Sequence, residues 1–275
     1  MKIKICYFSP AGATKQVAQR LAIALGDRLG AGLEYCSYTL PRERDRLPEF
    51  GSDDLVLWAT PVYAGRVPNK TLDFVRQALR QRQAMLAGRP AVALVTFGNR
   101  AYDNALAELA AMMQECGMNL LGAAAVVTRH SFSNSLGADR PKAEDWEALN
   151  RFASKVAQKV KTGSVTAVHV PGQAHPDQYY TPLKTNNAPA LFLKAKPSCN
   201  QALCLHCGQC AQVCPMGSIV CRGGVPCFEG ICIKCQACRR GCPAGAIAFT
   251  DPEYCSHVAM IERAFAQPKQ SEFFI

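Results

Sequence analysis

Two cysteine runs with the same spacing constrain what this chain can fold into more than any other feature. Each run reads C-x2-C-x2-C-x3-C-P, and the second repeats the first at an offset of 28 residues. Three closely spaced thiolates followed by a fourth before a proline are the ligand pattern of bacterial [4Fe–4S] proteins. The duplication therefore predicts two [4Fe–4S] clusters. Their eight ligands are Cys204, Cys207, Cys210, Cys214, Cys232, Cys235, Cys238 and Cys242.

The fourth cysteine of each run has a different position from the first three. It lies past a short turn and points away from them, so it ligates the other cluster. This rule assigns to one cluster Cys204, Cys207, Cys210 and Cys242. It assigns to the other cluster Cys232, Cys235, Cys238 and Cys214. Because the runs exchange ligands, the two clusters are predicted to be neighbours.

Other uses of crowded cysteines explain less of the pattern. A zinc ribbon uses two C-x2-C pairs and stops at four ligands. A disulfide framework needs an oxidising compartment, which nothing else in the sequence indicates. Four further cysteines of this region lie outside the pattern, and we interpret them as small buried apolar residues. They are Cys199, Cys221, Cys227 and Cys255.

The formal charge of +10 first suggests a nucleic-acid partner. Eight thiolates around two cluster cores of charge 2+ would lower it to about +6, and a bound phosphate group would lower it to about +4. We therefore expect no nucleic-acid partner. No stretch approaches the roughly 20 apolar residues of a membrane span, so we expect no membrane partner. Residues 1–8 lack the apolar core of a secretory signal, and we expect a cytoplasmic protein.

The first part of the chain, residues 1–163, alternates short apolar runs with segments of helical periodicity. The apolar runs predict strands at residues 3–8, 33–38, 54–59, 90–97 and 120–128. The periodic segments predict helices at residues 12–29, 68–85, 102–116 and 141–161. Strands that alternate with helices form a parallel sheet covered on both faces. The predicted fold class is therefore α/β, with a doubly wound five-stranded parallel sheet.

The remainder of the chain divides by composition. Residues 164–198 are rich in proline and glycine with little periodicity, which predicts an ordered linker across a surface. Residues 199–250 hold both cysteine runs and are predicted to form a small α+β domain. Residues 251–275 form a C-terminal tail with a short helix at 254–265 and an aromatic end.

Three loops follow predicted strands of the sheet, at the edge where doubly wound folds bind ligands. The first, Ser9 to Thr14, opens a helix with small residues and hydroxyls that can cradle a phosphate. The other two, residues 60–68 and 97–103, each offer an aromatic side chain and a glycine-permitted turn. Together these two loops could enclose a flat ring, although ordinary connecting loops with core aromatics remain an alternative.

The sequence is similar to known families at these loops. The stretches Tyr7–Thr14, Pro61–Gly65 and Gly98–Asp103 resemble those of flavodoxins. With Leu193–Pro197 and both cysteine runs, the whole chain resembles the fused flavodoxin–ferredoxin family of anaerobes. The resemblance implies a flavodoxin-like first domain, a 2[4Fe–4S] ferredoxin-like second domain and FMN as a further cofactor.

The resemblance also implies which residues contact the FMN. Ser9, Gly12 and Thr14 would hold the phosphate, Tyr63 and Tyr102 would flank the ring, and Gly65, Gly98 and Asn99 would contact its edge. The full predicted set is Ser9, Ala11, Gly12, Ala13, Thr14, Pro61, Val62, Tyr63, Ala64, Gly65, Phe97, Gly98, Asn99, Arg100, Tyr102 and Asp103.

Two of these predictions concern single residues. The family's phosphate loop usually reads Ser-Gly-Thr-Gly-Asn-Thr, and the changes here predict weaker FMN binding, because each hydrogen bond lost to a charged group costs about 1.5–3 kcal/mol. Arg100 is predicted to stabilise the reduced flavin, and Asp103 to orient its own turn.

Three functions are compatible with these motifs. The favoured function is low-potential electron transfer between redox partner proteins such as ferredoxin-linked oxidoreductases. The alternative is an FMN-dependent reductase of a quinone, a flavin or another small acceptor, fed through the clusters. The third is a redox sensor with labile clusters. The long linker permits electron transfer within one chain or across a homodimer.

Overall fold

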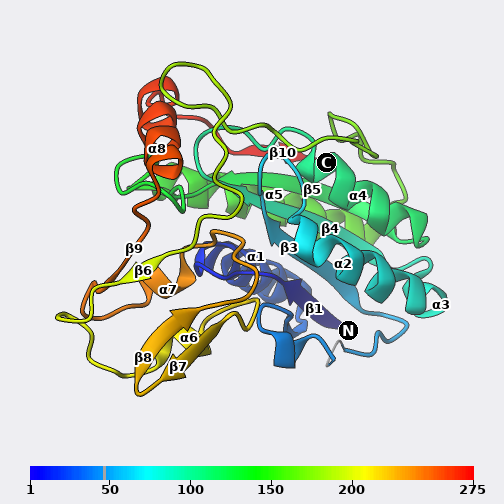
Figure 1. The fold of residues 1–275 in the computed structure, drawn as a ribbon. Coiled ribbons are helices and arrows are strands. Elements are labelled where there is room, and N and C mark those ends of the chain that lie inside the picture. Colours follow the sequence, from blue (N-terminus) through cyan, green and yellow to red (C-terminus); the bar gives the residue numbers. More distant parts are fainter. Residues whose placement is uncertain (46–47) are drawn as a thin grey trace.

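The structure is a computed structural model of the chain and describes residues 1–45 and 48–275. Its largest element is a twisted sheet with helices on both faces (Figure 1). Five of its strands are parallel and follow the order β2-β1-β3-β4-β5. Their bounds are β1 Lys2–Tyr7, β2 Gly32–Ser37, β3 Leu55–Pro61, β4 Pro90–Phe97 and β5 Asn119–Val127. This is the flavodoxin-like strand order, and the predicted doubly wound fold is confirmed.

Two hydrophobic cores lie on the two faces of the sheet. One face packs against α1 (Ala13–Leu29) and α5 (Ala143–Thr162). The other packs against α2 (Asn69–Gln81) and α4 (Ala105–Glu115), with the short α3 (Gln83–Leu86) beside them. The strands are buried on both faces, which explains why they read as apolar runs rather than as alternating patterns.

The sheet has one strand more than the sequence predicts. Residues Glu272–Phe274 form β10, which pairs antiparallel with the edge strand β5. Phe273 packs in the core beneath α5, and Phe274 packs in the core on the opposite face. The aromatic end of the chain therefore closes an edge of the sheet, because alternate side chains of a strand enter opposite faces.

The cysteine-rich part is a small α+β unit, as predicted. It contains two short helices and two short antiparallel pairs, and a longer helix follows it in the C-terminal tail. The bounds are α6 Gln209–Gln212, α7 Ala237–Arg240 and α8 Pro252–Ala264, with pairs β6 (Ser198–Cys199) with β9 (Ile247–Ala248) and β7 (Ile219–Arg222) with β8 (Val225–Phe228).

The cysteine-rich part packs against the end of the sheet where the parallel strands finish (Figure 1). The Arg240 guanidinium donates hydrogen bonds to the carbonyl oxygens of His130, Ser131 and Ser133, which follow β5, at 2.8–3.1 Å. Near β2, at the other edge of the sheet, Arg44 donates to the carbonyl oxygen of Pro215 at 2.5 Å. These contacts hold the cysteine runs over the ligand-binding edge of the fold.

The segment between the two parts lies across the loop that follows β3. Tyr179 donates its hydroxyl hydrogen to the carbonyl oxygen of Val67, and the Tyr180 N–H donates to the carbonyl oxygen of Ala64. Both tyrosine rings carry an arginine over their faces: Arg66 lies 4.5 Å from the Tyr179 ring centre, and Arg100 lies 4.0 Å from that of Tyr180. Tyr179 and Tyr180 therefore cover the loop that follows β3.

Within the described residues, we find no helix with the length and apolarity needed to cross a membrane.

Candidate functional site

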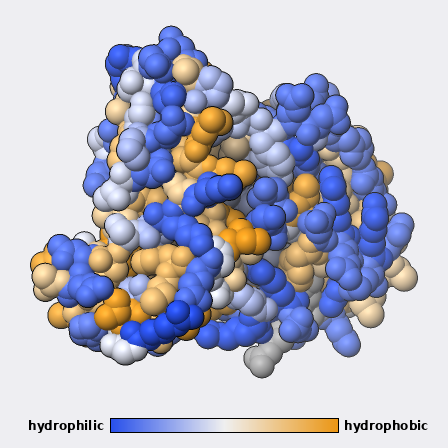
Figure 2. Space-filling view, in the orientation of Figure 1, coloured by the Kyte–Doolittle hydropathy of each residue, from blue (hydrophilic) through white to orange (hydrophobic). Residues whose placement is uncertain are grey.

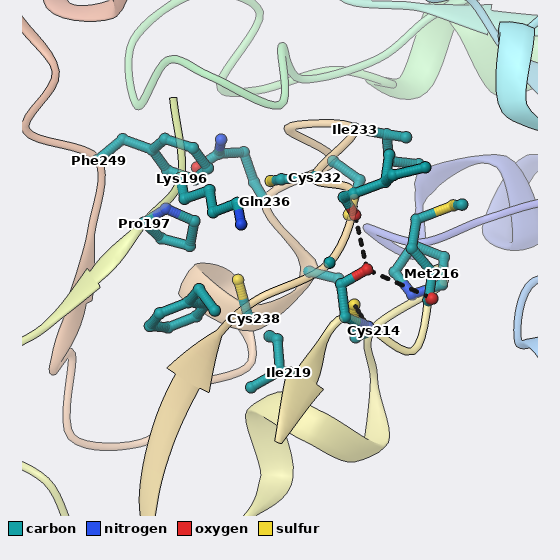
Figure 3. A pocket seen from close by; sticks show the side chains of 17 residues that line it. Lys196, Pro197, Cys214, Met216, Ile219, Cys232, Ile233, Gln236, Cys238 and Phe249 are labelled. Carbon is teal, nitrogen blue, oxygen red and sulfur yellow. Dashed lines mark hydrogen bonds between the residues drawn. The ribbon is translucent and has the colours of Figure 1, made fainter. Parts of the chain in front are cut away.

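Four cysteines from both runs line one cavity, which we call the inner site. They are Cys214, Cys232, Cys235 and Cys238. Figure 3 shows the side chains of Cys214, Cys232 and Cys238 directed toward the middle of this cavity, with Ile219 and Phe249 among the apolar residues around it. This is the set that the crossing rule assigns to one cluster.

The other four cysteines line a second cavity, which we call the outer site. They are Cys204, Cys207, Cys210 and Cys242. Cys207 is exposed, whereas Cys235 and Cys238 of the inner site are buried. The structure thus brings together both predicted ligand sets, and the outer set is the more accessible to solvent.

The two cysteine runs have the same backbone conformation as well as the same cysteine spacing. Paired positions 28 residues apart share left-handed φ values: His206 (54°) with Lys234 (55°), Gly208 (70°) with Gln236 (66°), and Gly217 (60°) with Gly245 (62°). The crossing cysteines also match, because the Ser218 N–H donates to Cys214 Sγ at 3.4 Å and the Ala246 N–H donates to Cys242 Sγ at 3.3 Å. The two halves are therefore structural copies.

Two thiols of the inner site have raised pKa values because they are buried. Burial raises the pKa of Cys238 to about 12 and raises the pKa of Cys235 well above its usual range. Without a metal these thiols stay protonated at neutral pH, so that cluster binding releases their protons. Among the described residues, no group of three or more His, Cys, Asp or Glu side chains is gathered as a single metal ion requires.

The remaining cysteines differ from our interpretation of them as buried residues. Cys221 and Cys255 are exposed, and Cys227 is half-buried. Cys199 lines the outer site, and burial raises its pKa to about 11, with a further contribution from the neighbouring Cys204 thiol. The interpretation was therefore wrong for Cys221 and Cys255. The position of Cys199 depends on the β6–β9 pairing, which the spacing of the runs does not reveal.

The first predicted loop, residues 9–14, joins β1 to α1. Gly12 caps the helix at φ +89°, and apart from its neighbours along the chain no atom lies within 4 Å of the position that a Cβ would take. Ala11 is exposed and Ala13 is half-buried. The Ser9 hydroxyl accepts a hydrogen bond from the Lys15 N–H at 2.9 Å, which leaves its own proton free to donate. The loop leaves space for an anion at the helix N-terminus.

Thr14 does not face this space. Its side chain is buried, and its hydroxyl lies 2.7 Å from the hydroxyl of Thr96 on β4. The prediction that Thr14 holds a phosphate with its side chain is therefore contradicted, because the hydroxyl is oriented toward the core of the sheet.

The second predicted loop follows β3 and folds into a tight turn. Tyr63 and Arg66 exchange two backbone hydrogen bonds, and the central residues Ala64 (φ 48°) and Gly65 (φ 80°) are both left-handed. Positive φ at both central positions is typical of a type I′ turn. Pro61 and Val62 lead into the turn, and Val62 packs against one core of the sheet.

Tyr63 connects this turn to the inner site. It is half-buried, and burial raises the pKa of its hydroxyl. The neighbouring Cys235 and Cys232 thiols raise that pKa further. In addition, Ile233 of the second run packs against the core of the sheet. The inner site is therefore the one that lies beside the loops of the sheet.

The third predicted loop is used differently from our prediction. Asn99 is buried, and its side-chain amide donates to the carbonyl oxygens of Phe265 and Gln267 at 2.8 and 3.0 Å and accepts from the Lys269 N–H at 2.8 Å. The amide thus binds the C-terminal segment and is not free for a ring edge. Gly98 is also packed against protein, because a Cβ there would lie 2.5 Å from the Cα of His130.

The remaining residues of this loop line a third cavity of about 330 Å³. Tyr102 contacts Phe97 edge to face and donates to Glu272 of β10 at 2.8 Å. Arg100 forms an ion pair with Asp103, as expected if Asp103 orients its own turn. The loop therefore packs against the C-terminal segment, a contact that no local sequence signal predicts.

Comparisons with solved structures find similar folds. A flavodoxin from the domain Archaea is 18% identical with a TM-score of 0.43, covering 58% of this chain and 99% of its own. Flavodoxin 2 from Bacillus cereus is 19% identical with a TM-score of 0.43, covering 58% and 99%. The rubredoxin oxygen:oxidoreductase of Desulfovibrio gigas is 17% identical with a TM-score of 0.42, covering 58% of this chain and 36% of its own.

A comparison with family models gives a more specific result for the cysteine-rich part. Residues 200–220 match the 4Fe-4S binding domain family. No curated protein matches the chain. The strand order of the sheet and this match agree with a flavodoxin-like part followed by a 4Fe–4S binding part, as in fused flavodoxin–ferredoxin proteins.

Proposed function

We propose that this chain transfers electrons at low potential between a redox partner protein, two [4Fe–4S] clusters and one FMN. The observation that carries the proposal is the pair of cavities, each lined by three cysteines of one run and the fourth of the other. This donor set fits a cubane cluster, since it supplies four thiols from several directions.

The cofactors supply the redox chemistry, in which each cluster carries one electron and FMN carries one or two. The chain positions them and excludes water. Apolar side chains such as Ile219 and Phe249 surround the inner site, and the Ser218 N–H supports the Cys214 sulfur. The exposed Cys207 makes the outer site the place at which an external partner exchanges electrons.

The support for FMN is the first loop and the composition of the helix turn that follows it. The first turn of α1 contains no acidic residue, so that the partial positive charge of the helix N-terminus is available to a phosphate. Ser9 and the backbone around Gly12 would hold that phosphate. Tyr63 would lie between the ring and the inner site, which gives electrons a short route from cluster to flavin.

We also propose the division of the chain that the sequence predicts. It comprises a flavodoxin-like domain at 1–163, a linker at 164–198, a ferredoxin-like domain at 199–250 and a tail at 251–275. The tail returns to the sheet through β10. Ferredoxin-linked oxidoreductases in the cytoplasm are the proposed partners.

Anaerobic purification followed by assays of iron, sulfide and FMN tests the proposal. The expected result is about eight irons and one FMN per chain, from two four-iron clusters. Four irons would refute the assignment of one ligand set. Eight irons with no flavin, also after incubation with FMN, would leave a ferredoxin on a sheet that binds no flavin.

A second candidate function is an FMN-dependent reductase of a small acceptor. One observation favours it: the cavity of about 330 Å³ beside the third predicted loop is lined by the aromatic residues Phe97 and Tyr102. A reductase should turn over a quinone or free flavin without a second protein. An electron carrier should show no such turnover, and should accept electrons from a low-potential ferredoxin.

A further inference from the structure

Lys234 is a buried cation between two cysteines of the inner site. Its side chain is 7% exposed, and its Nζ donates to the carbonyl oxygen of Cys232 at 3.0 Å and to that of Leu193. Among the described residues it forms no ion pair. The carboxylate that acts on it from a distance, Asp251, accepts the Tyr254 N–H at the start of α8.

A buried ammonium without a partner anion is costly, since desolvation is not offset by carbonyl oxygens alone. The ligands beside Lys234 can provide the missing charge. Four thiolates around a core of charge 2+ make a group of charge about 2−, and one added electron makes it about 3−. The cluster of the inner site would therefore be the counter-ion of Lys234. The attraction between the ammonium and the cluster increases when the cluster gains an electron.

The internal repeat offers a comparison within the same molecule. His206 occupies the position of Lys234 beside the outer site, with almost the same φ, and it is exposed. Residues 197–221 contain no Lys, Arg, Asp or Glu. The sulfur hydrogen bonds of Cys214 and Cys242 match, whereas the buried cation of Lys234 and the exposure of Cys207 distinguish the two sites.

The nearby cation and the exclusion of water have opposite effects on the reduction potential of the inner cluster. Water stabilises the more negative reduced state, so burial alone would make the inner cluster harder to reduce than the outer cluster. A nearby cation makes it easier to reduce, and acts strongly where water is excluded. Figure 2 shows apolar and hydrophilic side chains interspersed on the surface of the cysteine-rich part, and it is the burial of Lys234 that indicates weak screening of its charge.

We propose that Lys234 is the buried counter-ion of the inner cluster, and that its charge raises the potential of this cluster so that it accepts electrons from the outer cluster. The proposal rests on the function proposed above. The clusters, when bound, would supply one-electron exchange without transfer of a bond or a proton, and Lys234 would supply the positive charge beside the ligands Cys232 and Cys235. Ile233, the residue before Lys234, packs against the core of the sheet, so Lys234 lies on the side of the inner site that meets the sheet.

The test is a potentiometric titration of the anaerobic holoprotein, followed by electron paramagnetic resonance, with three variants. Lys234→Gln keeps a hydrogen-bond donor and removes the charge, and Lys234→Arg keeps the charge. Lys196→Gln removes an exposed cation that lines the same cavity. Iron content is measured for each variant.

We expect Lys234→Gln to lower the ratio of reduced to oxidised inner cluster at a fixed potential about tenfold, which is 59 mV for a one-electron couple. The outer cluster should be unchanged, Lys234→Arg should retain the wild-type potential, and Lys196→Gln should shift the ratio much less. An unshifted inner cluster in Lys234→Gln would overturn the inference and leave the proposed function intact.

Two further outcomes are decisive. If Lys234→Gln does not hold the inner cluster, Lys234→Arg carries the test, and a tenfold shift in that variant would overturn the inference because the charge is retained. Wild-type protein that binds only one cluster would instead refute the proposed function itself, which separates the two failures.

Discussion

Replacing Arg240 with alanine tests how the cysteine-rich part is held on the sheet. The guanidinium donates four hydrogen bonds to three carbonyl oxygens after β5, at 2.8–3.1 Å. A hydrogen bond to a charged group contributes about 1.5–3 kcal/mol, and such bonds to one side chain are not additive. We therefore expect Arg240→Ala to destabilise the protein by about 3 kcal/mol. At about 2–4 °C per kcal/mol for a chain of this size, the melting temperature should fall by about 6–12 °C.

The assay is anaerobic calorimetry of the holoprotein, with Arg239→Ala as the matched control. Arg239 is the neighbouring residue, is half-buried to a similar degree, and among the described residues makes no side-chain hydrogen bond. Its removal should lower the melting temperature much less. Equal melting temperatures for the two variants would refute the view that Arg240 fixes the cysteine-rich part to the sheet.

Four further substitutions have specific expected outcomes. Cys242→Ser, in the second run, should alter the resonance signal of the outer cluster, and Cys214→Ser that of the inner cluster; the reverse assignment would contradict the crossing of ligands. Asn99→Ala should free the C-terminal segment at a cost of about 1–3 kcal/mol from unpaired backbone groups, seen as faster hydrogen exchange at residues 265–274. Ser9→Ala should weaken FMN binding by at least about tenfold, from a lost bond of about 1.5–3 kcal/mol to the phosphate; an unchanged affinity would exclude Ser9 from the phosphate site.

Much of the fold follows from local patterns in the sequence. The apolar runs of the strands and the periodic helices depend on neighbouring residues, so that they predict the doubly wound sheet. The cysteine spacing was equally informative. Each run holds three closely spaced cysteines and a fourth before a proline, and this repeated spacing predicts which cysteines of the two runs meet. The structure places Cys242 with the first run and Cys214 with the second.

Other features depend on contacts between distant residues and leave little local signal. The pairing of residues 272–274 with β5 joins segments more than 140 residues apart. Asn99 also binds residues 265–269 through its side-chain amide. Because of these two contacts, the 97–103 loop packs against the C-terminal segment and not against the ring of the predicted FMN. The role of Lys234 could have been suspected from the sequence, since it replaces His206 in the repeat, but only its burial indicates a counter-ion.

We propose that electrons pass between the clusters and the flavin within one chain. Ile233, between Cys232 and Cys235, packs against the core of the sheet, and Arg44 binds the carbonyl oxygen of Pro215, so the inner site lies at the edge of the sheet where the flavin site is proposed. The most direct test is to reduce the clusters rapidly under anaerobic conditions and to follow flavin absorbance at a series of protein concentrations. The account predicts flavin reduction with a rate independent of concentration. A rate that falls on dilution, or clusters that stay reduced beside an oxidised flavin of higher potential, would contradict it.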